Sequence, residues 1–257
     1  MTMLVDAPPS VGFDTSGFYF PEPIVVQGTP VGDYYNALLR GLTHKLNNYL
    51  AVIQGFSSLI LMSDGLPGGV RENLDHMKEA TQGANQLGER ILAAGGCARM
   101  NPQAIQLKDF LPLIEPNLRP VCNRLNVPLQ INIAPEVPPI LADNGRFKEI
   151  LCELVTNAAE AVQMGGRSGA AAIDVLPPGR IAGGRPGHVD LFIRDTGPGI
   201  APEKMKDVFR SFHSTKDSKH YGIGLTLVHM LSGQMGIRVG AKSDAGTTTF
   251  WLSIPVA

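Results

Sequence analysis

Residues 33–62 carry an apolar stripe with the period of an α-helix. At about 100° per residue, the apolar positions that share one broad face are Leu38, Leu39, Leu42, Leu46, Tyr49, Leu50, Ile53, Phe56 and Ile60. His44 lies roughly opposite the centre of this face, and Asn48 follows one turn later on the same edge. The pattern therefore predicts a long amphipathic helix with an exposed histidine. An ordinary surface histidine would fit the same pattern.

A second apolar pattern, with spacing close to a heptad, follows a Gly- and Pro-containing turn at 63–69. Its positions are Val70, Leu74, Met77, Thr81, Ala84, Leu87 or Gly88, Ile91 and Ala94. Two helices of about 30 residues joined by a short turn predict an antiparallel hairpin. Each stripe is too apolar to leave in water, so we expect two chains to form a four-helix bundle, as a homodimer. The alternative is that the hairpin packs on the rest of its own chain.

Beyond a Gly- and Pro-containing linker near residue 100, the pattern changes to a mixture of short alternating runs and helical runs, which predicts an α+β fold. We expect strands near 104–107, 128–133, 171–175, 188–194, 237–242 and 248–254. We expect helices near 108–118, 144–163, 202–209 and 223–234, and a long hairpin loop at 177–187. Residues 1–30 show no sustained period and predict a loosely ordered arm able to dock locally. The expected domains are therefore 1–30, 31–100 and 101–257.

The composition is that of an ordinary soluble globular protein, with 257 residues, 44% hydrophobic and 18% charged. A formal net charge of −1 argues against nucleic acid or an anionic membrane as the main partner. The three cysteines are widely spaced, which favours buried reduced thiols over a disulfide or metal framework. The sequence shows no secretory leader and no apolar run of roughly 20 residues, the length that spans a bilayer. The expected location is cytoplasmic.

Polar residues recur along the predicted helix 144–163 at three- and four-residue spacing, which places Glu149, Glu153, Asn157 and Glu160 on one face. Such a face is usually only solvated. Asn157 is more suggestive, because an amide oxygen can ligate a hard divalent cation without adding charge. The cation is then left to offset the charge of a triphosphate, so Asn157 is a candidate Mg²⁺ ligand.

The turn Asp195-Thr-Gly-Pro-Gly199 follows a predicted strand. Its carboxylate can accept a hydrogen bond from an exocyclic amine such as that of adenine, and its two glycines permit close backbone approach. Gly222 and Gly224 open a predicted helix, where backbone N–H groups and the helix dipole favour phosphate. The intervening segment 209–220 predicts a cationic lid in which Lys216 is the best phosphate contact. An ordinary basic surface loop is an equal alternative.

The order of these motifs resembles the N, G1, F, G2 and G3 boxes of sensor histidine kinases. The matching segments are Glu153-Leu-Val-Thr-Asn-Ala158, Asp195-Thr-Gly-Pro-Gly199, Phe209 to Phe212, Gly222-Ile-Gly-Leu225 and Gly246-Thr-Thr-Thr-Phe250. His44-Lys-Leu-Asn-Asn48 resembles their H box, particularly its His-Asp-Phe-Asn-Asn variant, so the resemblance extends over residues 33–257. It implies a helical dimerisation and phosphotransfer domain joined to the α/β sandwich that binds ATP in gyrase, heat-shock chaperone and MutL ATPases.

The resemblance implies a role for each matching residue. His44 would be the phospho-acceptor, Asn157 a Mg²⁺ ligand and Asp195 the adenine contact. Asn48 matches the position that orients water when such proteins dephosphorylate a response regulator, and Thr248 would lie beside the adenine. The remaining nucleotide-pocket residues would be Gly197, Gly199, Gly222, Gly224 and Leu225, with Lys216 on the phosphates.

Two residues depart from the family pattern. Lys45 stands where the H box usually has Asp or Glu, and a protonated lysine cannot take a proton from the attacking histidine. Glu153 stands where many kinases have Asn, and it resembles the gyrase carboxylate that activates water, so a slow ATPase side activity is conceivable.

The leading hypothesis is a soluble, dimeric, ATP-dependent protein-histidine kinase. It would phosphorylate His44 and pass the phosphoryl group to an aspartate of a response regulator receiver domain. The alternatives are a phosphotransfer or scaffold protein that binds a regulator without phosphorylating itself, and a plain ATPase of the same superfamily.

Overall fold

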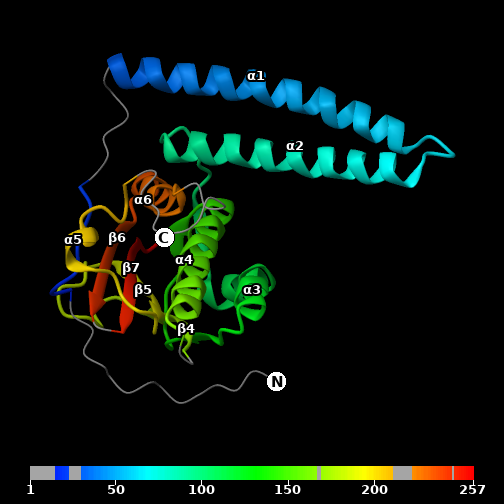
Figure 1. Ribbon diagram of the computed structural model, residues 1–257. Helices are drawn as coiled ribbons and strands as arrows, with labels where there is room; N and C mark the ends of the chain where they lie inside the picture. Colours follow the sequence, from blue (N-terminus) through cyan, green and yellow to red (C-terminus); the bar gives the residue numbers. More distant parts are fainter. Residues whose placement is uncertain (1–14, 23–29, 167–168, 211–221, 245) are drawn as a thin grey trace. The chain divides into compact units, whose positions relative to one another are not determined.

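The computed structural model describes residues 15–22, 30–166, 169–210, 222–244 and 246–257. The described residues form two compact units, drawn together in Figure 1. The helical unit contains residues 30–99, and the α/β unit contains residues 15–22 together with those from 100 onward. None of the helices in the described ranges combines the length and apolar character needed to cross a membrane.

The helical unit is the predicted antiparallel hairpin, made of α1 (Pro30–Leu61) and α2 (Gly68–Ala94). Small residues let the two helices approach closely: a Cβ added to Gly88 of α2 would lie 3.1 Å from the Thr43 Cγ2 of α1. Thr43 is accordingly buried, and so is Thr81 of α2. The interface within one hairpin therefore uses small side chains more than leucines.

Most of the apolar stripe on α1 stays exposed in the single hairpin. Its exposed members include Leu38, Leu42, Leu46, Tyr49, Ile53, Phe56 and Ile60. Contiguous exposed apolar surface of this kind usually marks an interaction site. The predicted dimerisation of the hairpin has an available surface here and stays a prediction.

A five-stranded sheet forms the centre of the α/β unit, in the order β2-β4-β5-β7-β6. Only β2 and β4 run parallel; the other neighbours are antiparallel. The strands are β2 (Leu129–Ile133), β4 (Ala171–Leu176), β5 (His188–Asp195), β6 (Arg238–Asp244) and β7 (Thr247–Pro255). A separate antiparallel pair joins β1 (Gln103–Ile105) to β3 (Ile140–Ala142).

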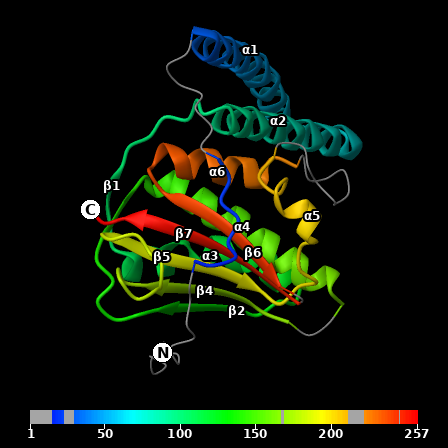
Figure 2. The ribbon, with the colours of Figure 1, turned by 90° about the vertical axis from the view of Figure 1, so that its left-hand side faces the viewer.

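Helices α3 (Leu107–Arg124), α4 (Asn144–Met164) and α6 (Gly224–Gln234) cover one face of this sheet, as Figure 2 shows. The core lies between the two layers, because the apolar face of α4 and the facing residues of the central strand β5, Val189, Leu191 and Ile193, are buried there. The predicted order, a helical hairpin followed by an α/β sandwich, is confirmed. The short helix α5 (Pro202–Met205) follows the turn after β5.

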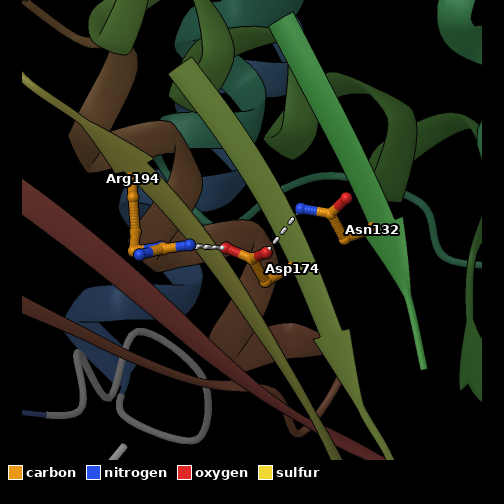
Figure 3. A network of polar contacts seen from close by, with 3 residues as sticks. All are labelled: Asn132, Asp174 and Arg194. Atoms are coloured by element: carbon orange, nitrogen blue, oxygen red, sulfur yellow. Dashed lines mark hydrogen bonds and ion pairs between the residues drawn. The ribbon is translucent and has the colours of Figure 1, made fainter. Parts of the chain in front are cut away.

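The opposite face of the sheet carries a polar network across three adjacent strands (Figure 3). Arg194 of β5 donates to Asp174 Oδ2 of β4 through Nε at 2.8 Å and Nη2 at 2.6 Å. Asn132 Nδ2 of β2 donates to Asp174 Oδ1 at 2.9 Å. Each oxygen of the nearly buried Asp174 carboxylate is thus satisfied, and the network ties the strands together without a covering helix.

The N-terminal strap, residues 15–22, covers the aromatic part of this same face, where it is drawn in blue in Figure 2. Tyr19 and Ala241 of the edge strand β6 exchange backbone hydrogen bonds of 2.7 and 2.9 Å. The Phe18 and Phe20 rings pack edge-on against Trp251, at centroid distances of 5.8 and 5.4 Å. The sequence predicted a loosely ordered arm, and its described part lies on the sheet.

Two predicted helices differ in extent from the structure, and one strand was missed. Helix α3 continues to Arg124 although it contains Pro112, Pro116 and Pro120, because these prolines share one exposed face where water can bond the freed carbonyls. Helix α5 ends at Met205, before the predicted residue 209. Strand β3 was not predicted, because Ile140-Leu-Ala142 is a short apolar run that shows no alternation with polar residues.

Candidate functional site

Helix α4 carries two of the predicted site residues and is fixed at its start by a side-chain cap. Asp143 accepts a hydrogen bond from the Arg146 backbone N–H at 2.9 Å, and its other oxygen accepts from Asn101 N at 2.7 Å. The apolar face of α4 is buried, whereas Glu153 and Asn157 are half-buried one turn apart. Their side chains therefore lie at the margin of the core, as the spacing predicted.

Asp195 ends β5 and is buried, with 3% of its surface exposed. Its Oδ1 accepts a hydrogen bond from the backbone N–H of Gly197 at 2.9 Å, which closes the turn on the carboxylate. Thr196 Oγ1 accepts from Ala170 N at 3.0 Å and ties the turn to the start of β4. These bonds hold the Asp195 carboxylate in one orientation.

Gly197 is required by the close approach of α4. A Cβ added there would lie 2.8 Å from the carbonyl carbon of Ala161 and 2.9 Å from its Cβ, distances that real Cβ atoms do not show. Ala161 lies one turn after Asn157 on the same helix, so Asn157 lies near the turn that follows Asp195.

Gly199 is required for a second reason, its φ of +84°. A Cβ added there would also lie 2.9 Å from the Asp244 carbonyl oxygen. The next residue, Ile200, donates its backbone N–H to Ser243 Oγ at 2.7 Å. Ser243 thus links the glycine turn to β6. No local sequence pattern pointed to Ser243, because its partner lies more than 40 positions away.

Thr248 of β7 is the cross-strand partner of Asp195. Directly opposite residues on adjacent strands point to the same face, and both residues are buried. Thr248 Oγ1 lies 3.4 Å from Ser243 Oγ. The structure therefore brings together a carboxylate and a hydroxyl, the two groups that the sequence placed beside an adenine.

Gly222 and Gly224 lead into α6, which packs beside α4. Gly222 has a φ of +64°, and Gly224 is the first residue of the helix. Leu225 follows and is half-buried. Lys216, the predicted phosphate contact, lies outside the described residues.

Phe209 is held against the first turn of α6. Its carbonyl accepts a hydrogen bond from Thr226 Oγ1 at 3.1 Å, and its ring is 4% exposed. The ring contacts His229 and Phe250 at centroid distances of 5.8 and 6.2 Å. Burial lowers the pKa of His229, so the imidazole against Phe209 is neutral at pH 7.

The α/β unit thus assembles a donor set that fits a nucleotide with its cation. The buried Asp195 carboxylate suits an exocyclic amine, and the two glycines let the turn pack tightly against Ala161 and the Asp244 carbonyl. Within the described ranges, no group of three or more His, Cys, Asp or Glu side chains could hold a metal ion. A Mg²⁺ ion bound at the predicted ligand Asn157 would take further ligands from water and phosphate oxygens, as this cation usually does.

The predicted phospho-acceptor lies in the helical unit. His44 is exposed, and the adjacent Thr43 is buried against Gly88, which fixes the face that His44 presents. Asn48 Nδ2 lies 3.4 Å from His44 Nδ1, and Lys45, the next residue in the chain after His44, is exposed. The contact engages Nδ1, so Nε2 is the ring nitrogen left for chemistry.

Comparison with known proteins shows what the α/β unit is similar to. Residues 142–257 match the family described as histidine kinase-, DNA gyrase B- and HSP90-like ATPase. The sensor kinase CckA of Brucella abortus is 27% identical over 228 residues, which cover 85% of this chain and 24% of that protein. The sensor histidine kinase ZraS of Escherichia coli is 26% identical over 225 residues, covering 85% of this chain and 45% of that protein.

A solved structure, full-length ShkA in complex with AMPPNP, shares the fold. It superposes with a TM-score of 0.72 at 24% identity, covering 86% of this chain and 46% of that one. The chain thus spans between about a quarter and a half of these matched proteins. The predicted resemblance to the transmitter core of sensor histidine kinases is confirmed.

Proposed function

We propose that this chain is an ATP-dependent protein-histidine kinase that phosphorylates His44 and transfers the phosphoryl group to an aspartate of a response regulator receiver domain. The observation that carries the proposal is the pairing of buried Asp195 with Thr248 at a glycine turn, within the segment that matches the ATPase family. An exposed histidine in a separate helical hairpin supplies the acceptor.

The nucleotide would be oriented from both ends. Asp195, held by the Gly197 N–H, accepts from the adenine amine, with Thr248 beside it. Backbone N–H groups at the start of α6 favour the phosphates, because the helix dipole is positive there. Asn157 offers its amide oxygen to Mg²⁺, which offsets the triphosphate charge when bound.

His44 would act as the nucleophile through Nε2. If the ring proton lies on Nδ1 and the Asn48 amide is turned so that its oxygen accepts it, Nε2 presents a lone pair. Attack on the γ-phosphorus forms an N–P bond and breaks the bond to the β-γ bridging oxygen, releasing ADP. A carboxylate of the receiver then attacks phosphorus, and the N–P bond breaks to restore the imidazole.

Asn48 would have a second role, in removing the phosphoryl group from the response regulator. Its amide lies close enough to the His44 ring to hold a water molecule near a phosphoryl group on a docked receiver. Dephosphorylation of the regulator is therefore part of the proposal. The exposed apolar stripe of α1 supports a homodimer, since pairing two hairpins would remove it from water.

Lys45 supports an alternative function, that of a phosphotransfer protein without autokinase activity. It is exposed beside His44, where an acidic residue would draw a proton from the ring. A lysine attracts phosphoryl oxygens but raises the cost of a positively charged imidazole next to it. The two functions differ in the first step alone, the uptake of phosphate from ATP.

Incubation of the chain with γ-labelled ATP and Mg²⁺ tests the proposal. We expect an acid-labile label in the wild type that is lost in His44→Ala and kept in His76→Ala, which removes another exposed histidine of the hairpin. Asn157→Asp and Asp195→Asn should abolish binding of a non-hydrolysable ATP analogue without unfolding the chain. Equal labelling of His44→Ala would reject His44 as the acceptor. Free phosphate release that survives His44→Ala but stops in Glu153→Ala would identify an ATPase.

A further inference from the structure

The N-terminal strap contacts the nucleotide-binding half of the α/β unit through one side chain, Tyr19. The Tyr19 hydroxyl donates a hydrogen bond to the Lys206 carbonyl at 3.1 Å, just after α5. Its ring stacks on Phe209 with a centroid distance of 6.4 Å and an interplanar angle of 23°. Tyr19 therefore holds both the backbone and the ring of the segment that leads up to residue 210.

Phe209 carries this support to α6. Its carbonyl accepts from Thr226 Oγ1 at 3.1 Å, and Thr226 is the third residue of the helix that Gly224 begins. A side-chain hydroxyl at that point ties the first turn of α6 to Phe209. Any displacement of Phe209 would thus shift the backbone N–H groups at the start of α6, which we assign to the phosphates.

The aromatic residues on either side of Tyr19 attach to the sheet elsewhere. Phe18 and Phe20 contact Trp251, and a Cβ added to Gly240 would lie 2.6 Å from a Phe20 ring carbon. The Arg238 guanidinium lies 3.8 Å from the centroid of the Phe20 ring. These contacts anchor the strap on the sheet and involve no residue of the nucleotide site.

We propose that Tyr19 is a positioning residue for the phosphate end of the nucleotide site, acting through Phe209 and Thr226. This inference rests on the proposed function. It adds to the ATP-binding unit a residue from before the helix that carries His44. It also makes a specific prediction: loss of Tyr19 should lower the affinity for the phosphates and leave the affinity for adenine unchanged.

The test compares two substitutions within the strap. Tyr19→Leu removes the stacking and the hydroxyl, whereas Phe18→Leu removes a ring that contacts only Trp251 and Phe20 among the aromatic pairs described. Titration with a non-hydrolysable ATP analogue and, separately, with adenosine gives two dissociation constants for each variant. One aromatic pair and one hydrogen bond correspond to roughly tenfold in affinity.

We expect Tyr19→Leu to raise the Kd for the ATP analogue about tenfold with the Kd for adenosine unchanged, and Tyr19→Phe, which keeps the stacking, to recover most of the loss. Phe18→Leu should lower thermal stability and leave both constants as in the wild type. Equal losses for the ATP analogue and adenosine in Tyr19→Leu, or no loss in a folded Tyr19→Phe and Tyr19→Leu pair, would overturn the role of Tyr19. If the wild-type chain binds no ATP analogue, the proposed function itself falls.

Discussion

Asp190 is a fully buried carboxyl group beneath the N-terminal strap, and its charge is predicted to limit the stability of the α/β unit. Trp251 Nε1 donates to Asp190 Oδ1 at 2.9 Å. Oδ2 is buried and has no hydrogen-bond partner among the described residues. Burial in this apolar environment raises the Asp190 pKa from 3.8 to about 6, against the opposing effect of the Trp251 hydrogen bond.

The sign and size of the effect follow from linkage between protonation and folding. Since the folded chain binds this proton more tightly than the unfolded chain, the free energy of unfolding falls as pH rises from 3.8 through about 6. At 1.36 kcal/mol per pH unit, the loss is about 3 kcal/mol at and above neutral pH. Asp190→Asn imitates the protonated acid, so it should raise the free energy of unfolding by up to this amount at pH 7.5 and hardly at all near pH 4.

Urea unfolding followed by Trp251 fluorescence measures this directly, because Trp251 is the only tryptophan of the chain and contacts Asp190. Stability is compared between wild type and Asp190→Asn at several pH values from 4.5 to about 8. Glu136→Gln, which removes an exposed carboxylate from a turn of the same unit, is the control for a general effect of charge. A stability difference that does not change with pH would refute the reasoning, since it would mean that the Asp190 carboxyl group is not protonated preferentially in the folded chain.

Two further substitutions probe the proposed reaction. Lys45→Asp should raise the rate of His44 labelling by γ-labelled ATP, by on the order of tenfold, if missing base capacity limits attack; an unchanged rate would mean that another group accepts the proton. Gly197→Ala should weaken binding of an ATP analogue at least about tenfold, because the new methyl group pushes against Ala161 and overpacking costs about 1–3 kcal/mol. Gly233→Ala in α6, where an added Cβ meets nothing within 4 Å, is its control and should bind as the wild type does.

Local patterns predicted the elements that are long or strongly periodic. The stripe on α1 and the spacing on α4 were sufficient to find both helices and to place Glu153 and Asn157 on one face. The glycine turn after β5 was also visible, because a strand pattern stopped at Asp195. Each of these features is encoded within a dozen or so neighbouring residues.

What the sequence did not reveal depends on contacts between distant segments. The role of Ser243 arises only when β6 lies beside the glycine turn. The strap looks like an arm because its partner Ala241 is more than 200 residues away. Neither a single β-bridge nor a contact between rings produces a periodic pattern of apolar residues in the sequence of the strap. The three consecutive aromatic residues Phe18-Tyr19-Phe20 are a hint of docking. In an extended chain their side chains point alternately to opposite sides, so both sides of the segment need apolar contacts.

The attachment of the strap changes how a signal could reach the proposed kinase. Only residues 23–29 separate the strap from Pro30, the start of α1, and α2 returns to the α/β unit within a few residues of Ala94. The hairpin that carries His44 is therefore linked to the α/β unit at both of its open ends, by covalent chain at one and by chain plus strap at the other. Any partner that pulls on the chain before α1 would act first on Tyr19 and its neighbours, and through Phe209 on the turn of α6 that we assign to the phosphates.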